Sequence, residues 1–198
     1  IFLRNHDELD LGRLTDAQRE TVFGAFAPEK HMQLYDRGIR RRLMPMLSGD
    51  ERRAKLAYSL MFTLPGTPVV RYGDELGMGD NLRLKERNSV RTPMQWSTEP
   101  HGGFSTAKET VVPVITGGPY GFEKVNAAAQ RRDLESLLNW TERIIRMRKE
   151  VPEIGWGNFE IVETKNRGIL AIRYEWRNNA VLVMHNLLDA QVEVELRL

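Results

Sequence analysis

The sequence contains no cysteine, and this absence excludes disulfide frameworks, cysteine-ligated zinc, iron–sulfur clusters and a cysteine nucleophile. The absence of cysteine fits a reducing compartment, so we expect a cytoplasmic protein. No apolar run approaches the roughly 18 residues of a membrane-spanning helix, and we expect no membrane association. An excess of one charge is also missing, because 29 Lys and Arg oppose 27 Asp and Glu and leave a net charge of +2. So small an excess is weak support for nucleic acid binding, which we do not expect.

What is present is the composition of an ordinary globular protein. The chain has 198 residues, of which 41% are hydrophobic and 28% are charged, enough to bury a core in one or two domains. It opens on the apolar run Ile1-Phe2-Leu3 without an initiator methionine, and it ends within the alternating pattern of residues 192–198. Both ends resemble interrupted elements, so we expect the sequence to be an excerpt of a longer enzyme.

Residues 1–150 alternate short apolar runs with segments of helical period. Residues 1–3 and 69–72 are short, apolar and followed by polar residues, which is typical of strands buried on both faces of a parallel sheet. Thr15 and Gln18 have the spacing of a capping box, so a helix should follow directly. The irregular residues 77–120 are too long for a plain connection, and their aromatic residues favour an ordered functional loop. The helices predicted from periodicity cover residues 16–27, 37–47, 50–63 and 125–150.

After Pro152 the apolar period changes from about 3.6 residues to 2, which indicates strands in place of helices. We therefore place a domain boundary near residues 151–155, with a small antiparallel sheet after it. Polar turn residues at 165–168 and 177–179 predict hairpin connections. The predicted strands cover residues 159–162, 169–174, 180–185 and 192–196.

The pair His6-Asp7, at the end of the first apolar run, is the sharpest local feature. At the C-terminal end of a barrel strand, a carboxylate can stabilise developing positive charge and an imidazole can donate to a sugar hydroxyl. A simpler explanation is that Asp7 caps the following turn and His6 is an ordinary polar group. The spacing alone favours the simpler explanation.

Two arginines of the long loop, Arg87 and Arg91, can act as forks that clamp a carboxylate or a substrate hydroxyl. A structural ion pair that holds the loop in place is the alternative. The loop aromatics Trp96, Phe104 and Tyr120 can stack on a sugar ring or can form a small aromatic core of the loop.

Two clusters of charge have simpler explanations than a binding site. The run Arg40-Arg41-Arg42 lies on the predicted helix 37–47 without interleaved aromatic residues, so we interpret it as a solvated helix face. Asp74-Glu75 and Asp80 suggest a metal site, but they lack the regular spacing of a ligand loop. Capping, or pinning of the loop, explains these acids at least as well, and no metal site is predicted.

Five segments follow one another along the chain in a specific order. They are residues 2–9 (FLRNHDEL), 38–43 (GIRRRL), 64–69 (LPGTPV), 72–81 (YGDELGMGDN) and 90–96 (VRTPMQW). Their order and spacing resemble the α-amylase superfamily, glycoside hydrolase family 13, and most closely its trehalose synthase and α-glucosidase branch. The resemblance covers nearly the whole chain.

The resemblance implies an α/β fold. Residues 1–151 would be the C-terminal part of the catalytic (β/α)8 TIM barrel, namely its last two βα units, with strands at 1–4 and 69–72. Residues 152–198 would be the start of a partial antiparallel C-terminal β domain.

The resemblance also implies roles for three residues. His6 would bind hydroxyls of the sugar in the −1 subsite, and Asp7 would be the family carboxylate that stabilises the oxocarbenium-like transition state. Arg87 matches the arginine that contacts the outer hydroxyls of that sugar. Two positions depart from the pattern, because Asn88 stands where the family usually has Asp, and Asp10 where trehalose synthases usually have Thr.

The family's nucleophilic aspartate and general-acid glutamate precede residue 5 in the family order and have no counterpart in this sequence. We therefore predict the C-terminal part of an α-retaining enzyme that interconverts maltose and trehalose or hydrolyses α-glucosides, and we expect this chain alone to be inactive. The alternative is a non-catalytic amylase-like interaction domain. No cofactor is predicted here, and calcium stays open for the full-length enzyme. An uncovered barrel edge predicts self-association when the chain is expressed alone.

Overall fold

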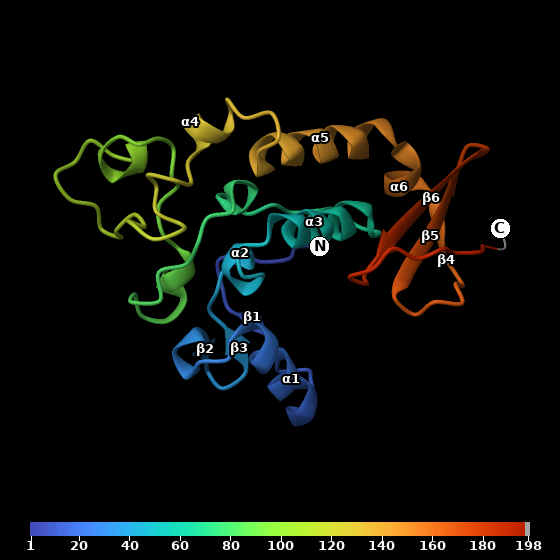
Figure 1. The fold of residues 1–198 in the computed structure, drawn as a ribbon, viewed down its shortest axis with the longest axis horizontal. Coiled ribbons are helices and arrows are strands. Elements are labelled where there is room, and N and C mark those ends of the chain that lie inside the picture. The colour runs from blue at the N-terminus through green and yellow to red at the C-terminus, as the bar shows by residue number, and fades with distance from the viewer. Residues whose placement is uncertain (197–198) are drawn as a thin grey trace. The chain divides into compact units, whose positions relative to one another are not determined.

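The computed structural model describes residues 1–196, and Figure 1 shows the order of its elements. None of the helices within these residues is both long and apolar enough to cross a membrane. The helices are α1 (Asp16–Phe26), α2 (Leu43–Met46), α3 (Glu51–Thr63), α4 (Ala127–Gln130), α5 (Leu137–Glu150) and α6 (Pro152–Trp156), with short 3₁₀ turns η1 (Lys30–Met32), η2 (Asp74–Leu76), η3 (Glu86–Val90) and η4 (Pro100–Gly103). The strands are β1 (Leu9–Asp10), β2 (Gln33–Leu34), β3 (Gly38–Ile39), β4 (Asn158–Val162), β5 (Ile169–Trp176) and β6 (Asn179–Asn186).

The chain divides into two compact units. The first, here the sheet unit, contains Ile1, Leu56–Pro68 and the chain from Glu142 onward. The second, here the loop unit, contains Phe2–Lys55 and Val69–Thr141. The domain division at residues 151–152 that the sequence suggested stays a prediction.

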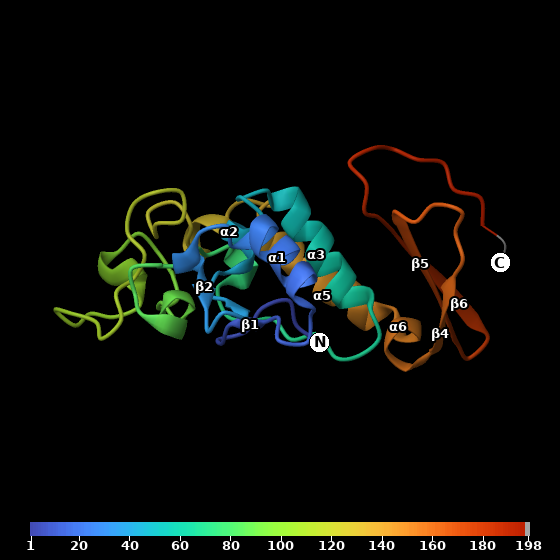
Figure 2. The same cartoon turned by 90° about the horizontal axis from the view of Figure 1, so that it is seen from below.

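The sheet unit is built on an antiparallel sheet in the order β4-β5-β6, which Figure 2 shows beside α6. The sequence analysis predicted these three strands from their alternation, and the structure confirms them. Ile154 of α6 packs with Ile172 and Tyr174 of β5 in a buried cluster. The hydroxyl of Tyr174 also donates a hydrogen bond to the carbonyl oxygen of Thr63. The apolar face is therefore covered at β5 within its own unit, whereas Phe159 and Ile161 of β4, which pair with Tyr174 and Ile172, stay exposed.

Both predicted hairpin turns are confirmed. Arg177 and Asn178 have positive φ angles of 48° and 65°, and they connect β5 to β6 where Trp176 pairs with Asn179. Two successive left-handed residues match the twist of the strands they join. At the other turn, Asn166 Oδ1 accepts a hydrogen bond from the backbone N–H of Gly168 at 2.9 Å.

The fourth predicted strand, residues 192–196, is not formed. Among residues 1–196 this segment pairs with no strand, and the sheet ends at β6. Alternating side chains give a segment the pattern of a strand, but the strand needs a neighbouring backbone to accept its hydrogen bonds. Arg197 and Leu198, the end of the same pattern, lie outside the described residues.

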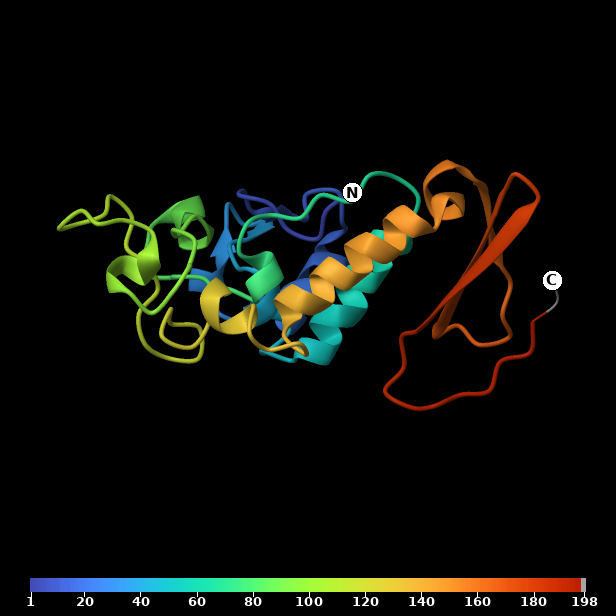
Figure 3. The same cartoon turned by 90° about the horizontal axis from the view of Figure 1, so that it is seen from above.

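The loop unit contains a helix that the sequence predicted and the structure confirms. Thr15 Oγ1 accepts from the backbone N–H of Gln18, and Gln18 Oε1 accepts from the N–H of Thr15, so the capping box predicted from their spacing is present at the start of α1. The small sheet β1-β3-β2 belongs to the same unit, with β1 before α1 in the chain and Leu9 opposite Ile39. The predicted long loop is ordered, and Figure 3 shows it as the green to yellow part of the ribbon.

The two predicted barrel strands, residues 1–4 and 69–72, were wrong as local elements. Neither forms a strand, and the side chains of Ile1, Phe2 and Val69 are exposed. A parallel strand exists only where neighbours complete its backbone ladder. Within residues 1–196 no strand pairs with either segment, so neither segment becomes part of a sheet.

Two predicted helices were also wrong in their extent. In place of one helix over residues 37–47, the chain forms β3 and then the short α2. Pro45 lacks an N–H, and its ring would clash with the carbonyl of Arg41, so a helix cannot run through it from residue 37. The helix predicted over 125–150 breaks into α4 and α5. Asn126 Oδ1 caps α4 by accepting from Ala129 N at 2.8 Å, and Ser136 Oγ accepts from the N–H of Asn139 at the start of α5.

His185, near the end of β6, is a buried titratable group of the sheet unit. Its side-chain Nε2 lies 3.0 Å from Ser59 Oγ and 3.4 Å from Thr63 Oγ1. Burial lowers the pKa of His185 below its ordinary value of 6.5. As the pH falls through 6.5, His185 therefore takes up a proton in the unfolded chain before it does so in the folded chain. Its contribution to the free energy of unfolding is thus greatest above pH 6.5 and falls as the pH drops toward the lower pKa of the folded state.

We expect the free energy of unfolding to fall as the pH is lowered from 7.5 to 5.5. Urea unfolding followed by circular dichroism at both pH values measures this. His185→Gln keeps a polar side chain for Ser59 but does not titrate, so it should reduce the pH dependence. His31→Gln replaces an exposed histidine and is the matched control variant. An equal pH dependence in wild type and His185→Gln would contradict the assignment.

Candidate active site

A tight turn holds the backbone around Asp7. Asn5 Oδ1 accepts a hydrogen bond from the N–H of Asp7 at 2.9 Å, and Arg4 Nη2 donates to the carbonyl oxygen of Asp7 at 2.9 Å. Arg4 is almost fully buried, and burial lowers its pKa to about 10. Arg71 Nη1 donates to the carbonyl oxygen of Asn5 at 2.9 Å. Two buried guanidinium groups therefore fix the path of residues 5–7.

The carboxylate of Asp7 lies between two guanidinium groups and an imidazole. Arg91 Nη2 donates to Asp7 Oδ1 at 2.9 Å, and Arg87 Nε lies 3.4 Å from the same oxygen. The other oxygen, Oδ2, is 3.6 Å from Nε2 of the exposed His6. Arg91 Nε also donates to the carbonyl oxygen of His6 at 2.8 Å. The structure thus brings the three predicted site residues together.

Glu8 is a member of this cluster to which the sequence analysis gave no role. Arg87 Nε donates to Glu8 Oε2 at 2.6 Å, and Arg87 Nη2 donates to Oε1 at 3.2 Å, which makes a two-pronged pair. The hydrogen bond from Arg87 lowers the pKa of Glu8. Gly38 leaves room for this side chain, because a Cβ there would lie 2.6 Å from Glu8 Cγ. A glutamate directly after Asp7 was the available signal, but nothing local pointed to its partner.

Of the two explanations left open for the loop arginines, the structure shows ion pairs. Arg87 contacts Glu8 and Asp7, and its guanidinium lies 5.7 Å from the centre of the Tyr35 ring. Arg87 pairs with Glu8 and Asp7, and Arg91 pairs with Asp7, so both arginines bind carboxylates, which was one of the two roles predicted for their guanidinium groups. Contact of Arg87 or His6 with a sugar stays a prediction.

The interpretation of Arg40-Arg41-Arg42 as a solvated helix face was wrong. Arg42 is fully buried, and its Nη1 donates to Asp74 Oδ1 at 3.0 Å and to the carbonyl oxygen of Tyr72 at 3.0 Å. Arg41 Nε donates to Asp80 Oδ2 at 3.4 Å. The run is not helical here, so its side chains turn inward and meet the acids. Asp74 and Asp80 thereby pin the loop, as the sequence analysis allowed.

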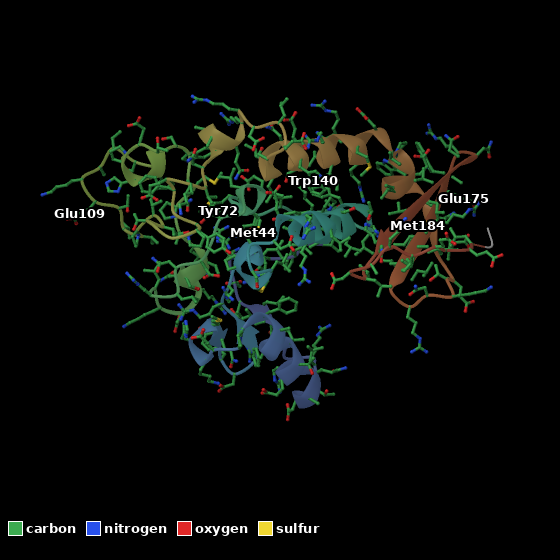
Figure 4. The ribbon with its side chains drawn as sticks, viewed as in Figure 1. Met44, Tyr72, Glu109, Trp140, Glu175 and Met184 are labelled. Carbon is green, nitrogen blue, oxygen red and sulfur yellow. The ribbon has the colours of Figure 1, made fainter. Side chains whose placement is uncertain are left out.

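A hollow of about 730 Å³, here called the Trp96 pocket, lies next to this cluster in the loop unit. Arg91 belongs both to the pocket lining and to the clamp on Asp7. Figure 4 labels two further lining residues, Tyr72 near the middle of the picture and Glu109 on the outer loop at its left edge.

The three loop aromatics have separate surroundings. Trp96 and Phe104 are about half exposed and line the Trp96 pocket. Tyr120 instead lies against Gly79, where an added Cβ would come within 2.6 Å of its ring. Trp96 and Phe104 thus face the Trp96 pocket, whereas Tyr120 is half-buried against the backbone at Gly79.

No group of three or more His, Asp or Glu side chains within residues 1–196 has the arrangement of a metal site. The acidic side chains of the cluster contact arginines. What the arrangement offers chemically is a carboxylate that two guanidinium groups hold in place, with one oxygen directed to the exposed imidazole of His6.

Known proteins resemble this chain in sequence. The family described as alpha amylase, catalytic domain, matches residues 34–157. Trehalose synthase from Thermus thermophilus is 45% identical over 190 residues, which are 94% of this chain and 20% of that protein. Trehalose synthase from Pimelobacter sp. (strain R48) is 41% identical over 205 residues, which are 100% of this chain and 36% of that protein. The chain therefore spans between a fifth and just over a third of the length of these relatives.

Solved structures agree in fold. The trehalulose synthase MutB from Pseudomonas mesoacidophila MX-45 matches with a TM-score of 0.60 at 22% identity, over 94% of this chain and 34% of that chain. The α-amylase from H. orenii matches with a TM-score of 0.56 at 27% identity, over 75% of this chain and 28% of that chain. These are TIM-barrel enzymes, while the assignment of this chain to the last two barrel units stays a prediction. The family match over more than half of the chain, with trehalose synthases at 41–45% identity, shows that the chain belongs to the α-amylase family, glycoside hydrolase family 13, in its trehalose synthase branch.

Proposed function

We propose that this chain is the C-terminal part of an α-retaining enzyme that acts on short α-glucosides. The activity is the interconversion of maltose and trehalose or the hydrolysis of α-glucosides. The single observation that carries the proposal is the Asp7 carboxylate, which Arg91 and Arg87 hold while its side chain stays 38% exposed. The match to trehalose synthases supports the choice of substrate class.

In this proposal Asp7 stabilises positive charge at the sugar. Cleavage of a glycosidic bond passes through an oxocarbenium-like state, and a fixed carboxylate nearby lowers its energy. The pairs with Arg91 and Arg87 engage Oδ1, so Oδ2 is the oxygen that would face the ring. Because both arginines hold the carboxylate before substrate arrives, little reorganisation is needed during the reaction.

His6 and Arg87 are proposed to contact hydroxyls of the same sugar. The exposed imidazole of His6 lies beside Asp7 Oδ2, where it can donate to a hydroxyl group. Arg87 is engaged with Glu8 through Nε and Nη2, and it can reach a sugar with its remaining nitrogen, Nη1. Glu8 then acts as a positioning residue that orients Arg87.

Retaining hydrolysis also needs a nucleophile and a general acid whose carboxyl groups lie about 5–5.5 Å apart. We assign neither role within this chain and place both in the remaining length of the enzyme. Isomerisation requires that the cleaved glucose stays shielded from water. Residues 77–120 are the proposed cover. Calcium in the full-length enzyme, a cytoplasmic location and self-association of the isolated chain stay predictions.

The test is an assay of the longer protein that carries this chain, with maltose, trehalose and sucrose as substrates and chromatography of the products. We expect maltose and trehalose to interconvert, or free glucose to appear. The 198-residue chain alone should show no turnover, because it supplies only one of the three carboxylates. Turnover by the isolated chain would contradict the proposal. A longer protein that converts none of these sugars would favour the non-catalytic interaction domain.

A further inference from the structure

The hairpin formed by β2 and β3 presents an aromatic ring to Arg87. The guanidinium carbon of Arg87 lies 5.7 Å from the centre of the Tyr35 ring, within the reach of a cation–π contact. Tyr35 stands at the hairpin turn, where the N–H of Arg37 donates to the carbonyl oxygen of Leu34 at 3.3 Å. The Tyr35 side chain is about half exposed, so its ring contributes little to the hydrophobic core. The contact with Arg87 is therefore the interaction through which this ring can act.

The backbone of Tyr35 is in a conformation that a tyrosine seldom adopts. Its φ angle is 54°, and the next residue, Asp36, has a φ angle of 54° as well. Two successive left-handed residues suit a hairpin turn, but glycine, asparagine and aspartate adopt this conformation at lower cost than a bulky side chain. Outliers of this kind concentrate at functional sites. The hairpin thus carries an aromatic ring at a position where asparagine would suit the backbone better.

Hydrogen bonds connect this hairpin to the segment that carries Arg87. Arg40, directly after β3, donates through Nε to Ser89 Oγ at 3.2 Å and through Nη2 to the carbonyl oxygens of Leu82 and Leu84. In return, Ser89 Oγ donates to the carbonyl oxygen of Arg40 at 2.9 Å. Ser89 and Arg87 both belong to η3. The aromatic ring and the guanidinium group therefore stand on two segments that are fixed to each other.

Glu8 restrains only part of the motion of the Arg87 guanidinium. Its two carboxylate oxygens accept from Nε and Nη2 of Arg87, so both hydrogen bonds lie along one edge of the planar group. The group can still tilt about that edge, and the tilt swings Nη1, the nitrogen that can reach a sugar. An aromatic ring against one face of the guanidinium opposes this tilt. Glu8 therefore fixes the position of the group, and Tyr35 fixes the direction of Nη1.

We propose that Tyr35 is a positioning residue, whose ring holds Arg87 in the orientation in which Nη1 faces an outer hydroxyl of the sugar. Tyr35 acts through Arg87 and makes no contact with the substrate itself. The orientation of Arg87 by Tyr35 is independent of the function proposed above. The effect of that orientation on a sugar rests on the proposed function.

The hairpin turn allows a matched set of variants. Tyr35→Asn removes the ring but suits the left-handed backbone, so the midpoint of thermal unfolding should stay equal or rise. Tyr35→Phe keeps the ring and should behave like the wild type. Asp36→Asn changes the neighbouring residue of the same φ angle, whose carboxylate pairs with Lys30 at 2.5 Å, and it is the control for an altered turn.

Steady-state kinetics of the longer enzyme measure the effect on the sugar. Tyr35→Asn should raise KM for the α-glucoside substrate about two- to fivefold, the size expected of an exposed cation–π contact. Its kcat should hardly change, because Arg87 holds the sugar in the ground state and in the transition state alike. A loss of folded enzyme would instead lower kcat at an unchanged KM. Tyr35→Phe and Asp36→Asn should keep the wild-type KM, and Tyr35→Asn should raise KM no further in an Arg87→Ala background.

Crystal structures of the longer enzyme without substrate test the orientation of Arg87 directly. We expect one conformer of Arg87 against the ring in the wild type and in Tyr35→Phe, and more than one in Tyr35→Asn. If Arg87 keeps a single orientation in Tyr35→Asn, the proposal is overturned whatever the activity. An unchanged KM in Tyr35→Asn of an active enzyme would overturn it as well. If the orientation is lost but the longer protein converts none of the sugars, the proposed function fails while the positioning of Arg87 by Tyr35 stands.

Discussion

Asp7→Ala in the longer enzyme is expected to lower kcat on maltose by about 10²–10³-fold, the usual effect of removing one preorganised electrostatic group from a transition state. The effect should fall mainly on kcat, because the carboxylate acts on charge that develops only as the glycosidic bond breaks. Asp7→Asn keeps the size of the side chain and an oxygen for Arg91 but removes the charge. We expect it to lose nearly as much activity as Asp7→Ala.

The control for this prediction is Asp10→Asn. Asp10 lies three residues further along and is exposed, with a loose ion pair to Arg37 at 3.6 Å. The N–H of Gly12 donates to Asp10 Oδ1 at 2.7 Å, and the amide oxygen of Asn can keep this hydrogen bond, so the variant should retain wild-type kcat. The stability of Asp7→Asn should change by less than about 1 kcal/mol, because the Asp7 pairs are partly exposed and such pairs contribute little. Turnover like that of the wild type after Asp7→Ala would remove Asp7 from the reaction.

The parts of this fold that the sequence predicted correctly depend on near neighbours. The capping box of Thr15 and Gln18 acts over three residues and placed the start of α1 correctly. The alternation after Pro152 placed β4, β5 and β6 for the same reason, since each hairpin joins strands that follow one another. The segments at 1–4 and 69–72 had an equally good apolar pattern, but a parallel strand depends on distant partners that the pattern does not contain.

The candidate site shows the same limit. His6, Asp7 and Arg87 were named through a resemblance that spans the chain, and the structure brings them together. The partner of Arg87 was missed because Glu8 lies 79 residues away, and no local pattern records a contact of that separation. Arg42 was assigned to a helix face, although Pro45 three residues later was a readable signal against that helix.

Arg42→Met is expected to destabilise the chain by about 3–5 kcal/mol, the usual cost of removing one partner from a buried ion pair. Arg42 is fully buried and donates to Asp74 Oδ1 and to the carbonyl oxygen of Tyr72, each at 3.0 Å. Methionine fills the space without charge, so the carboxylate of Asp74 loses a buried cation. Urea unfolding measures the change. Arg52→Met, at an almost fully exposed position of α3, is the control and should change stability by less than about 0.5 kcal/mol.

The pH dependence and a double variant separate charge from packing. Burial raises the pKa of Asp74, and the guanidinium of Arg42 opposes that effect, so in Arg42→Met the pKa of Asp74 should rise further. A carboxyl group with a raised folded-state pKa favours folding below its unfolded value and loses this contribution as the pH rises through the folded value. The stability deficit of Arg42→Met should therefore shrink at acidic pH.

The double variant Arg42→Met with Asp74→Asn should recover part of the lost stability at neutral pH, because it removes both charges. The native pair is incompletely satisfied, since Arg42 Nε and Nη2 are buried without hydrogen-bond partners among residues 1–196. If the loss of stability is equal at neutral and acidic pH and is unchanged in the double variant, Arg42 stabilises the loop unit by packing alone.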